Sequence, residues 1–592
     1  MGAAKWPLGA ILLYTRLTMS PFERVRNSGA YLTSRAWRFF ASETRGMHEA
    51  AYLLAAFAFA SQVIGLLRDR ILAASFGAGH TLDLYYAAFR VPDFLFATIA
   101  SLFSLYALLP ILSRLEEERK GLMISFLRDL TFVFLLGMTF FSLVAYALAP
   151  LLLPVIAPGL SDAASRTDLV LLIRILLLQP ILLGISNTIS SLTQLRHRFL
   201  LYSISPLLYN LGIIFGAVAL YPRFGIAGLG LGVVFGAFLH MAVQLPFFFG
   251  EKGEGRVELP RLVSLTKEIL ALSIPRTLAL ASNQISLLII IALASFLAPG
   301  SIAVFNFSYN LQSVPLTIIG ISYSVAAFPT FARLYAKGAK EEFTRYAEAA
   351  LRHIIFWSVP CTVFVIVLRA QIVRTILGAG QFDWSATRLT AAALALFVLS
   401  LLAQSATFLI SRAYYAIGNT KKPFYFGLFD IAVSVISAFA LLAVFHENLF
   451  FRNFVEALLR VSDISGTSVL MLALGYALGS IAEFFVGYSF FLNDFSVSRA
   501  AFQRLFFESF AASVIGGAAS YIILSATGQV GTINTTLGIF AQGAGAGIVG
   551  IAVSVFMLRL LKSRELSEVL GALRRRFVDA PAIVAIEPSD VK

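Results

Sequence analysis

Residues 61–95 read SQVIGLLRDRILAASFGAGHTLDLYYAAFRVPDFL. Most of this stretch is apolar, yet it contains six charged residues: Arg68, Asp69, Arg70, Asp83, Arg90 and Asp93. A charged side chain at the centre of a bilayer costs roughly 2.5–3.5 kcal/mol on insertion scales, so such residues face a bundle interior or a watery cavity. The stretch therefore predicts two neighbouring membrane-spanning helices whose polar faces line a common interior.

The composition of the whole chain agrees with a membrane protein. Of its 592 residues, 58% are hydrophobic and 13% are charged, and the mean hydropathy is +0.83. A soluble domain carries about 25% charged residues. The net charge of +14 comes from basic residues in short loops, which indicates membrane topology and not a nucleic-acid partner. The single cysteine, Cys361, excludes an intrachain disulfide and a cysteine-rich metal site.

Apolar segments long enough to cross a bilayer recur along the chain, and we predict fourteen spans. They lie at about 50–77, 82–110, 126–156, 168–193, 200–220, 225–249, 268–297, 302–331, 351–378, 388–411, 424–445, 468–492, 505–526 and 533–560. Loops after even-numbered spans are rich in Lys and Arg, whereas the turns 77–81, 298–301 and 527–532 have none. This asymmetry predicts that both termini are cytoplasmic.

The first 48 residues form a basic extension without a convincing signal-peptide cleavage pattern. We expect this extension to be cytoplasmic and to contact anionic lipid headgroups. A second hypothesis is that translation starts at Met47, just ahead of the first span.

An internal repeat divides the chain. Shifting it by 220 residues aligns LAASFGAG (72–79) with ALASFLAPG (292–300), and the register holds from about residue 60 to 215. Repeats of this kind are typical of transporters, whose substrate site lies between the two halves. We predict an all-α polytopic membrane protein with two pseudo-symmetric six-helix lobes, followed by two further helices. The predicted boundaries are 1–48 (extension), 49–250 (first lobe), 251–498 (second lobe), 499–562 (last two spans) and 563–592 (cytoplasmic tail).

The first lobe supplies most of the intramembrane charge. Arg68, Asp83 and Arg90 are predicted to line the cavity, whereas Arg70 is predicted to reach the membrane interface and pair with Asp69 and Asp83. Gln62 shares a helix face with Asp69. These side chains suit an anionic headgroup because Arg binds phosphate bidentately.

The second lobe is polar but nearly uncharged at the equivalent spans. Asn306 and Asn310 begin a polar stripe on the eighth span, and Arg276 is a candidate anion contact on the seventh. The asparagines could also serve only in interhelical hydrogen bonding. Asp430 and Glu483 are lone carboxylates in apolar spans, each a candidate for a coupling monovalent cation or proton or for a structural polar contact.

The chain contains no P-loop, nucleophile elbow or metal-binding motif. We therefore expect no enzyme activity and no cofactor, and we expect transport to be driven by an ion gradient or the membrane potential.

The stretch 61–95 closely resembles the opening motif of the MurJ/MviN lipid II flippases of the MOP exporter superfamily. Residues 283–322, GAGQFD (378–383) and RAYYAIGNTKKP (412–423) are similar to the same family in order and spacing. The resemblance implies export of an undecaprenyl-diphosphate-linked peptidoglycan precursor through a central cavity, with the last two spans forming a groove for the lipid tail. It also implies membrane phospholipids as surroundings and leaves open a contact with the cell-wall synthesis machinery.

Carried onto this sequence, the resemblance places Arg68 and Asp83 in the cavity, and Arg90 matches a basic position of the family. The chain departs from the family pattern where arginines are usual, at Gln62, at Phe96 and Ala97, and at Asn310. Either Arg70, Arg90 and Arg276 compensate, or the cargo differs. The alternatives are an exporter of another polyprenyl-linked oligosaccharide or amphiphile, and a non-transporting scaffold for cell-wall assembly.

Overall fold

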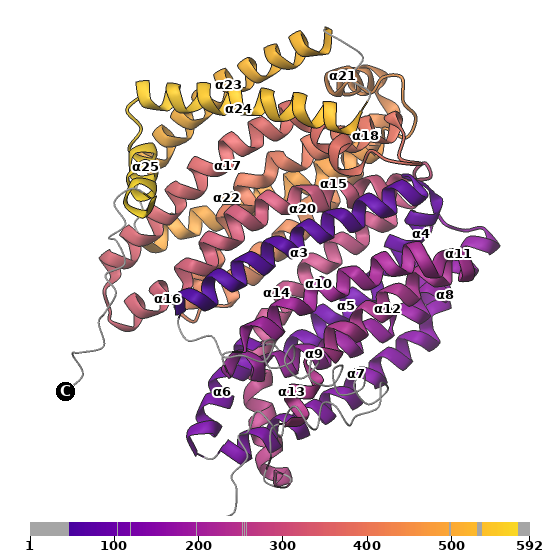
Figure 1. Ribbon diagram of the computed structural model, residues 1–592, viewed down its shortest axis with the longest axis vertical. Coiled ribbons are helices and arrows are strands. Elements are labelled where there is room, and N and C mark those ends of the chain that lie inside the picture. The colour runs from indigo at the N-terminus through magenta and orange to yellow at the C-terminus, as the bar shows by residue number, and fades with distance from the viewer. Residues whose placement is uncertain are drawn as a thin grey trace, which may run out of the picture.

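A computed structural model describes residues 47–577, apart from 104, 119, 197, 251–252, 254, 256, 496–498 and 530–534. Within this part of the chain every regular element is a helix, which confirms the all-α prediction. Figure 1 shows two bundles side by side, the first in indigo to magenta and the second in red to orange. The predicted extension, residues 1–48, falls almost entirely outside the described residues, so both hypotheses about it stay predictions.

The first lobe is built from helices in chain order, many of them broken within a single predicted span. They are α3 (Met47–Phe76), α4 (His80–Ala88), α5 (Arg90–Thr98), η1 (Ala100–Phe103), α6 (Leu105–Glu118), α7 (Lys120–Ile156), α8 (Ala163–Leu176), α9 (Leu178–Leu195), α10 (Phe199–Phe215), η2 (Gly216–Leu220), α11 (Tyr221–Phe224), α12 (Ile226–Ala242) and α13 (Leu245–Gly250).

The second lobe follows, and the two last long helices lie beside it. The second-lobe elements are α14 (Leu259–Ala294), α15 (Ser301–Leu316), η3 (Thr317–Ile321), α16 (Ser322–Ala336), α17 (Lys340–Leu377), α18 (Trp384–Phe397), η4 (Val398–Ser400), α19 (Leu401–Ala416), α20 (Lys421–Glu447), α21 (Leu449–Leu459) and α22 (Val469–Phe495). They are followed by α23 (Arg499–Gln529), α24 (Thr536–Leu560) and α25 (Arg564–Phe577).

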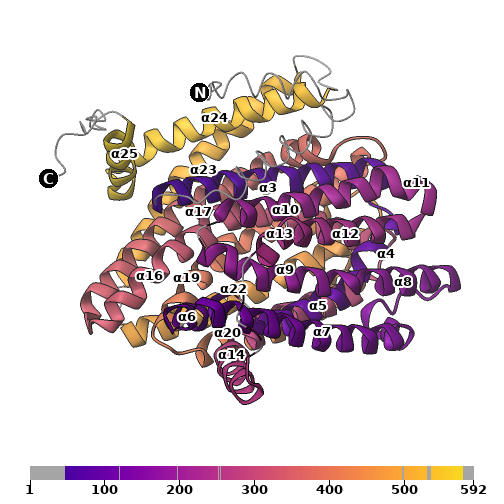
Figure 2. The same ribbon diagram turned by 60° about the horizontal axis from the view of Figure 1, so that its bottom comes forward.

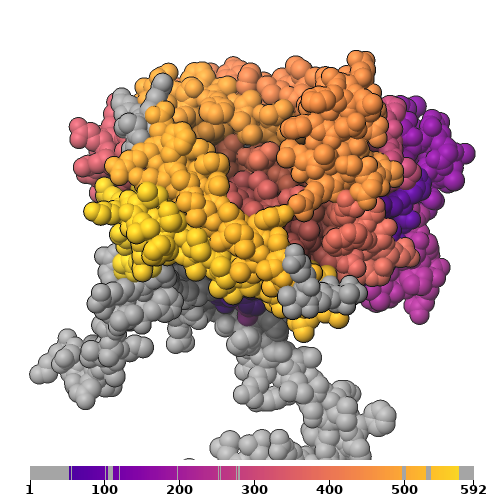
Figure 3. Space-filling view, turned by 90° about the horizontal axis from the view of Figure 1, so that it is seen from above, coloured from indigo at the N-terminus to yellow at the C-terminus, as the bar shows by residue number. Residues whose placement is uncertain are grey.

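The last two long helices pack on the outside of α17. Figure 2 shows α24 along one edge of the molecule, with α23 and then α17 beneath it. Figure 3 looks onto this face, with yellow α24 and α25 in front of a hollow whose floor is formed by red residues of the second lobe.

Eleven helical segments of the described chain are long and apolar enough to cross a membrane. The other three predicted spans coincide with α3, with the run from α4 to α6, and with α14, which offers the shorter apolar stretch Ala281–Ala294. These three segments carry the arginines singled out above, whereas Asn306, Asn310, Asp430 and Glu483 lie in segments that are among the eleven. The count of fourteen therefore stays a prediction.

The predicted span 82–110 is a series of short helices rather than one rod. Pro92 lacks the N–H that would bond the carbonyl of Ala88, and proline at an interior position breaks or kinks a helix. The break falls at Phe89, between α4 and α5. The backbone at Phe89 stays in the right-handed helical region, with φ of −68° and ψ of −22°, so Arg90 directly follows α4 at the start of α5.

Helix α14 packs against both lobes. Leu265 and Ile269, near its start, belong to an apolar cluster with Leu112 and Leu127 of the first lobe. Near its end, Ser282 approaches Gly427 of α20 in the second lobe. The helix therefore contacts both lobes, although the predicted boundary between the lobes, at residues 250 and 251, assigns all of α14 to the second lobe.

Two short helices were not expected. The 446–467 segment, predicted as a long mixed-charge loop, contains α21, and the predicted tail 563–592 begins with α25. Glu565 and Glu568 of α25 contact Arg352 and His353 of α17 at 3.8 Å and 3.4 Å. Residues 578–592 lie outside the described part of the chain.

Helix α12 approaches α10 and η2, which follows α10 directly, through glycines. A Cβ added at Gly212 would lie 2.2 Å from the Cα of Gly236, and one added at Gly232 would lie 2.3 Å from the Cα of Gly216. Small residues allow this close backbone packing in membranes.

Gly232→Val is therefore expected to lower the thermal stability of the purified protein by several degrees, because the two helices must separate to accommodate the side chain. Gly137→Ala is the matched control, since an added Cβ there meets nothing within 4 Å and alanine favours the helix by up to ~1 kcal/mol. Equal melting temperatures for Gly232→Val and the unchanged protein in one detergent would contradict this packing.

Candidate functional site

A cavity of about 220 Å³ lies between the two lobes, and both contribute to its wall. It is lined by Arg68, Leu72, Tyr85, Tyr86, Phe89, Arg90, Asp93, Gln179, Tyr209, Ile213, Asn306 and Asn310. The charged and aromatic groups come from the first lobe, and the second lobe adds two asparagines of α15. At about 30 Å³ per water molecule, the cavity has room for roughly seven waters. A phosphoryl group fits, whereas a whole lipid-linked glycan requires the lobes to move apart.

Arg68 is held in place by neighbours on α3 and α10. Its Nε and Nη2 donate to Oδ1 of Asp69 at 2.9 and 2.8 Å, and its Nη1 donates to Oδ1 of Asn210 at 2.9 Å. The remaining oxygen of Asp69 accepts a hydrogen bond from Nδ2 of Asn310 at 3.1 Å. Asp69 therefore fixes Arg68 and joins α3 to the second lobe, while Arg68 still borders the cavity.

Arg90 is bound more weakly. Its Nε donates to the carbonyl of Tyr86 at 3.3 Å, and its Nη2 donates to Oδ1 of Asn306 at 3.4 Å. Asn306 is itself anchored by donating to the carbonyl of Ile302 at 2.8 Å. Among the described residues no carboxylate forms a direct ion pair with Arg90, but Asp93, which lines the same cavity, interacts with it electrostatically. Most of its donors are therefore available to an anion in the cavity.

The structure corrects the prediction for Asp83. Its carboxylate does not line the cavity; instead it accepts hydrogen bonds from the backbone N–H of Gly300 at 2.5 Å and of Ala303 at 2.9 Å. These amides belong to the N-terminal turn of α15, where free N–H groups and the helix dipole favour a negative charge. Asp83 of the first lobe therefore caps a helix of the second.

The prediction for Arg70 also needs correction. Its guanidinium donates to the carbonyls of Thr375 at 2.5 Å and Ile376 at 3.1 Å, at the C-terminus of α17, and not to Asp69 or Asp83. A cation suits the negative end of a helix. Arg70 is therefore a contact between the lobes and does not compensate for a missing cavity arginine.

Of two further predicted site residues, the structure describes the side chain of Gln62 but not that of Arg276. Gln62 is half-buried on α3 but is not among the residues that line the cavity. Arg276 belongs to α14, and its side chain is outside the described part of the structure.

Several cavity residues were missed. Tyr85 and Tyr86 precede Arg90 by about one helical turn, so a search for aromatic residues beside the charged stripe could have found them. Tyr209 adjoins Asn210, but nothing in the sequence connects α10 with Arg68. For Gln179 the sequence shows only that it is a polar residue in an apolar span, which does not predict a place in the cavity.

The lobes meet tightly at one end, which we call the turn end: the turns 77–79, 157–160, 295–300 and 378–381. Gly300, with φ of +90°, brings its α-carbon so close to Ala78 that an added Cβ would lie 2.1 Å from that carbonyl oxygen. The amide of Gln381 donates to the carbonyl of Ala74 at 2.9 Å, and the amide of Gly159 donates to Oγ of Ser295 at 2.9 Å. At Gly300 there is no room for a side chain larger than glycine, and backbone groups of the two lobes are in direct contact. The lobes are therefore packed together at this end.

A family model described as "Lipid II flippase MurJ" matches residues 72–541. The chain belongs to this family.

Individual MurJ relatives are distant in sequence. The chain is 26% identical over 514 residues to the probable lipid II flippase MurJ of Thermotoga maritima, covering 86% of this chain and 96% of that protein. A structure titled "Lipid II flippase MurJ, inward closed conformation" matches with a TM-score of 0.65 at 20% identity, over 86% of this chain and 99% of that one. A multidrug resistance MATE family transporter of the MOP superfamily, in an inward-facing conformation, matches with a TM-score of 0.60 at 14% identity, over 74% and 94%. The two structures support the fold, and the family makes the chain a membrane transporter and not an enzyme.

This MurJ-family transporter has a second polar cluster, inside the second lobe. Asp430 of α20 is buried and accepts a hydrogen bond from Ser434 at 3.2 Å. A Cβ added at Gly479 of α22 would lie 2.9 Å from the Asp430 carbonyl oxygen, so the two helices touch at this level. Glu483 lies one helical turn beyond Gly479 and interacts electrostatically with Asp430.

No group of three or more His, Cys, Asp or Glu residues able to hold a metal ion occurs in the described part of the chain. The Asp430–Glu483 cluster, with two carboxylates, has the composition of a weak monovalent cation or proton site. That assignment stays a prediction.

Proposed function

We propose that this transporter moves an undecaprenyl-diphosphate-linked peptidoglycan precursor, lipid II, from the cytoplasmic to the outer leaflet by alternating access. The observation that carries the proposal is the cavity between the lobes, where Arg90 forms no direct ion pair within the described chain and Arg68 borders the same space. Guanidinium groups in a cavity suit a diphosphate because they bind phosphate bidentately. Family membership supports this choice of cargo.

The proposed topology has fourteen spans with both termini in the cytoplasm, in two six-helix lobes followed by α23 and α24. In this topology the turn end faces the outside, so the described conformation is closed to the outside. The headgroup enters from the cytoplasm, the turn-end contacts break, and the lobes rock about the cavity. The lipid tail stays in the membrane beside α23 and α24, where Figure 3 shows a hollow.

A complementation experiment tests the proposal. The chain is expressed in a bacterium depleted of its own lipid II flippase, and lipid II accessible on the outer face is measured. We expect growth and outer lipid II to be restored. No rescue, despite normal amounts of protein in the membrane, would contradict lipid II as the cargo.

One observation favours a second candidate, the export of another polyprenyl-diphosphate-linked oligosaccharide. Asn310 replaces a cation usual in the family and donates to Asp69, so the second lobe adds no charge to the cavity through α15. A cavity with fewer cations holds its anion less strongly. Rescue of a strain lacking a different polyprenyl-glycan flippase, without rescue of lipid II export, would favour this candidate. If the chain rescues neither strain but still supports normal cell-wall assembly, the non-transporting scaffold would be favoured.

The carboxylates of the second lobe are proposed to bind the coupling cation or proton. Asp430→Asn is expected to reduce gradient-driven transport about tenfold, within the range of coupling energies between linked sites, because the variant cannot exchange its charge. Flipping by protein reconstituted in vesicles is measured with and without a sodium or proton gradient. Asp463→Asn is the control, since Asp463 is an exposed partner of Arg388 in the 446–467 segment. Equal stimulation by the gradient in Asp430→Asn and the unchanged protein would contradict the role.

A further inference from the structure

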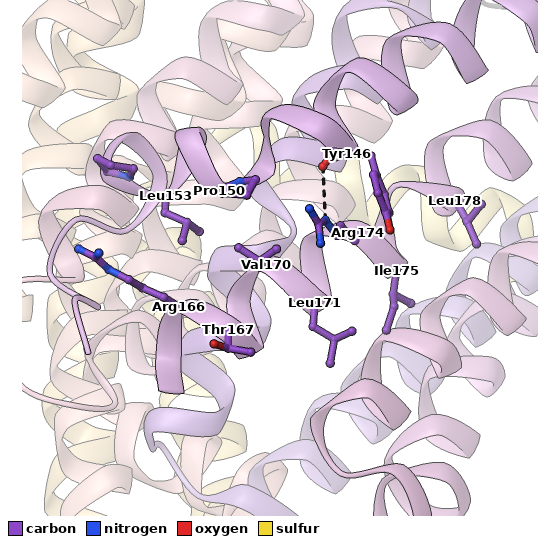
Figure 4. Close-up of a pocket in the computed structure, with 11 residues that line it drawn as sticks. Tyr146, Pro150, Leu153, Arg166, Thr167, Val170, Leu171, Arg174, Ile175 and Leu178 are labelled. Carbon is purple, nitrogen blue, oxygen red and sulfur yellow. Dashed lines mark hydrogen bonds between the residues drawn. The ribbon is translucent and has the colours of Figure 1, made fainter. Parts of the chain in front are cut away.

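A cavity larger than the one between the lobes lies away from it. It is a groove of about 780 Å³ between α7 and α8, on the outside of the first lobe, and shares no lining residue with the cavity between the lobes. Figure 4 shows α7 contributing Tyr146, Pro150 and Leu153, α8 contributing a stripe from Arg166 to Ile175, and the start of α9 contributing Leu178. Nothing in the proposed transport cycle uses this groove.

Arg174 is fixed in the groove by a proline. Pro150 has no N–H and cannot bond the carbonyl of Tyr146 four residues before it, so that carbonyl needs another donor. Nε of Arg174 donates to it at 3.4 Å, and the guanidinium carbon lies 4.6 Å from the centre of the Tyr146 ring. Both terminal amino groups of Arg174 remain free of hydrogen bonds within the described chain.

Arg166 adds a second positive charge at the mouth of the groove. It lies eight residues before Arg174 on α8, about 12 Å along the helix axis, and is exposed. No described acidic side chain forms an ion pair with either arginine. Because Cα–Cβ bonds in a helix tilt toward its N-terminus, Arg174 starts out in the direction of Arg166 and the membrane surface.

The surroundings of the groove are apolar and exposed. Leu151 and Val155 of α7 are 72% and 56% exposed, and Leu178, the first residue of α9, is 51% exposed. In a membrane protein such a surface faces lipid tails. An arginine that faces lipid without an anion is unfavourable by several kcal/mol, so the arrangement calls for a negatively charged occupant with an apolar body.

We propose that the α7–α8 groove binds an anionic phospholipid. Arg174 donates its terminal amino groups to the phosphate, Arg166 attracts the headgroup, and one acyl chain lies along Leu171, Ile175 and Leu178. The opposite charges and the apolar wall together select a lipid over free phosphate. In the proposed topology the lipid belongs to the outer leaflet, but the binding itself does not depend on transport.

The test measures lipid retention. Full-length protein is placed in nanodiscs of equal parts phosphatidylglycerol and phosphatidylethanolamine, released, and examined by native mass spectrometry. We expect one retained phosphatidylglycerol, and about tenfold lower retention in Arg174→Gln. Leu171→Trp, which fills the groove and keeps both arginines, is expected to lose the lipid as well. Added inorganic phosphate is expected not to displace it.

The matched control is Arg223→Gln, which removes an exposed charge near the same end of the first lobe, outside the groove. Equal retention in Arg174→Gln and the unchanged protein would overturn the proposal. Equal losses in Arg223→Gln and Arg174→Gln would also overturn it, since general surface charge would then explain binding. Displacement by phosphate would indicate an anion site without a lipid. Because retention is read from lipid mass, a flipping-inactive protein still reports on this site.

Discussion

Replacing Arg90 with glutamate is expected to abolish transport while leaving the amount of protein in the membrane nearly unchanged. Arg90 borders the interlobe cavity and is held only by two long hydrogen bonds, to Tyr86 and Asn306. Two like charges 4 Å apart at an effective dielectric constant of 20 repel by about 4 kcal/mol. That energy alone corresponds to about a thousandfold weaker binding of a diphosphate.

The series at position 90 separates charge from shape. Arg90→Gln removes the attraction without adding repulsion and is expected to reduce transport about a hundredfold. Arg90→Lys keeps the charge but loses the bidentate geometry, and is expected to stay within about tenfold of the unchanged protein. Outer-leaflet lipid II in the depleted strain is the measurement.

Arg223→Glu is the control for position 90, because it reverses an exposed charge outside the cavity. It is expected to rescue growth fully. Normal outer lipid II with Arg90→Glu would mean that the cargo is not anionic or that the protein does not transport. Both outcomes would remove the basis of the proposed function.

Arg90 also illustrates what the sequence could predict. The spacing of Arg68, Arg90 and the asparagines of the eighth span predicted polar faces turned to a common interior, and the structure brings these residues to one cavity. The prediction succeeded because an intramembrane charge has few alternatives to a cavity. The helical class followed from apolar length alone.

The partners of these residues could not be predicted. Asp83 lies on the expected stripe, yet it bonds backbone amides 217 and 220 residues away. Arg70 bonds carbonyls at the end of α17, again backbone groups without a sequence signature. The pattern of side chains along a helix indicates which face is polar. Which backbone groups at a distant helix end form hydrogen bonds with those side chains depends on how the two lobes pack together.

Asn310 shows the same limit. The sequence shows that a usual arginine is absent, but not that the asparagine holds Asp69 and thereby Arg68. The short helix α21 was missed for a different reason. Its eleven residues, LFFRNFVEALL, carry charges on one side and lie in a segment of mixed charge, below the length that identifies a span.

Replacing Asp83 with alanine is expected to open the turn end. The carboxylate joins the lobes through Gly300 and Ala303, and a hydrogen bond to a charged group contributes about 1.5–3 kcal/mol. Losing even one such bond corresponds to at least about a tenfold shift of the equilibrium between closed and open states. Asp83→Asn keeps an oxygen acceptor without the charge and is expected to lie between alanine and the unchanged protein.

Accessibility of the cavity from outside measures this shift. Cys361→Ser removes the single native cysteine, and Ile213→Cys places a thiol on the cavity wall. Labelling by a membrane-impermeant maleimide applied to intact cells is expected to be about tenfold faster with Asp83→Ala. Transport is expected to fall at the same time, because the cytoplasm-facing state that loads cargo becomes rarer.

Asp162→Ala is the matched control, because Asp162 also caps a helix near the turn end but does so within one lobe. Its Oδ2 accepts from the amide of Ser165 at 2.9 Å, and the hydrogen bonds from Ser165 hold the pKa of Asp162 below its ordinary value. Removing this cap frays the start of α8 and leaves the contact between the lobes intact, so labelling at position 213 is expected to stay slow. If Asp83→Ala labels no faster than Asp162→Ala, the hydrogen bonds of Asp83 are not what keeps the lobes closed. The packing of Gly300 against Ala78 would then be enough to hold the turn end together.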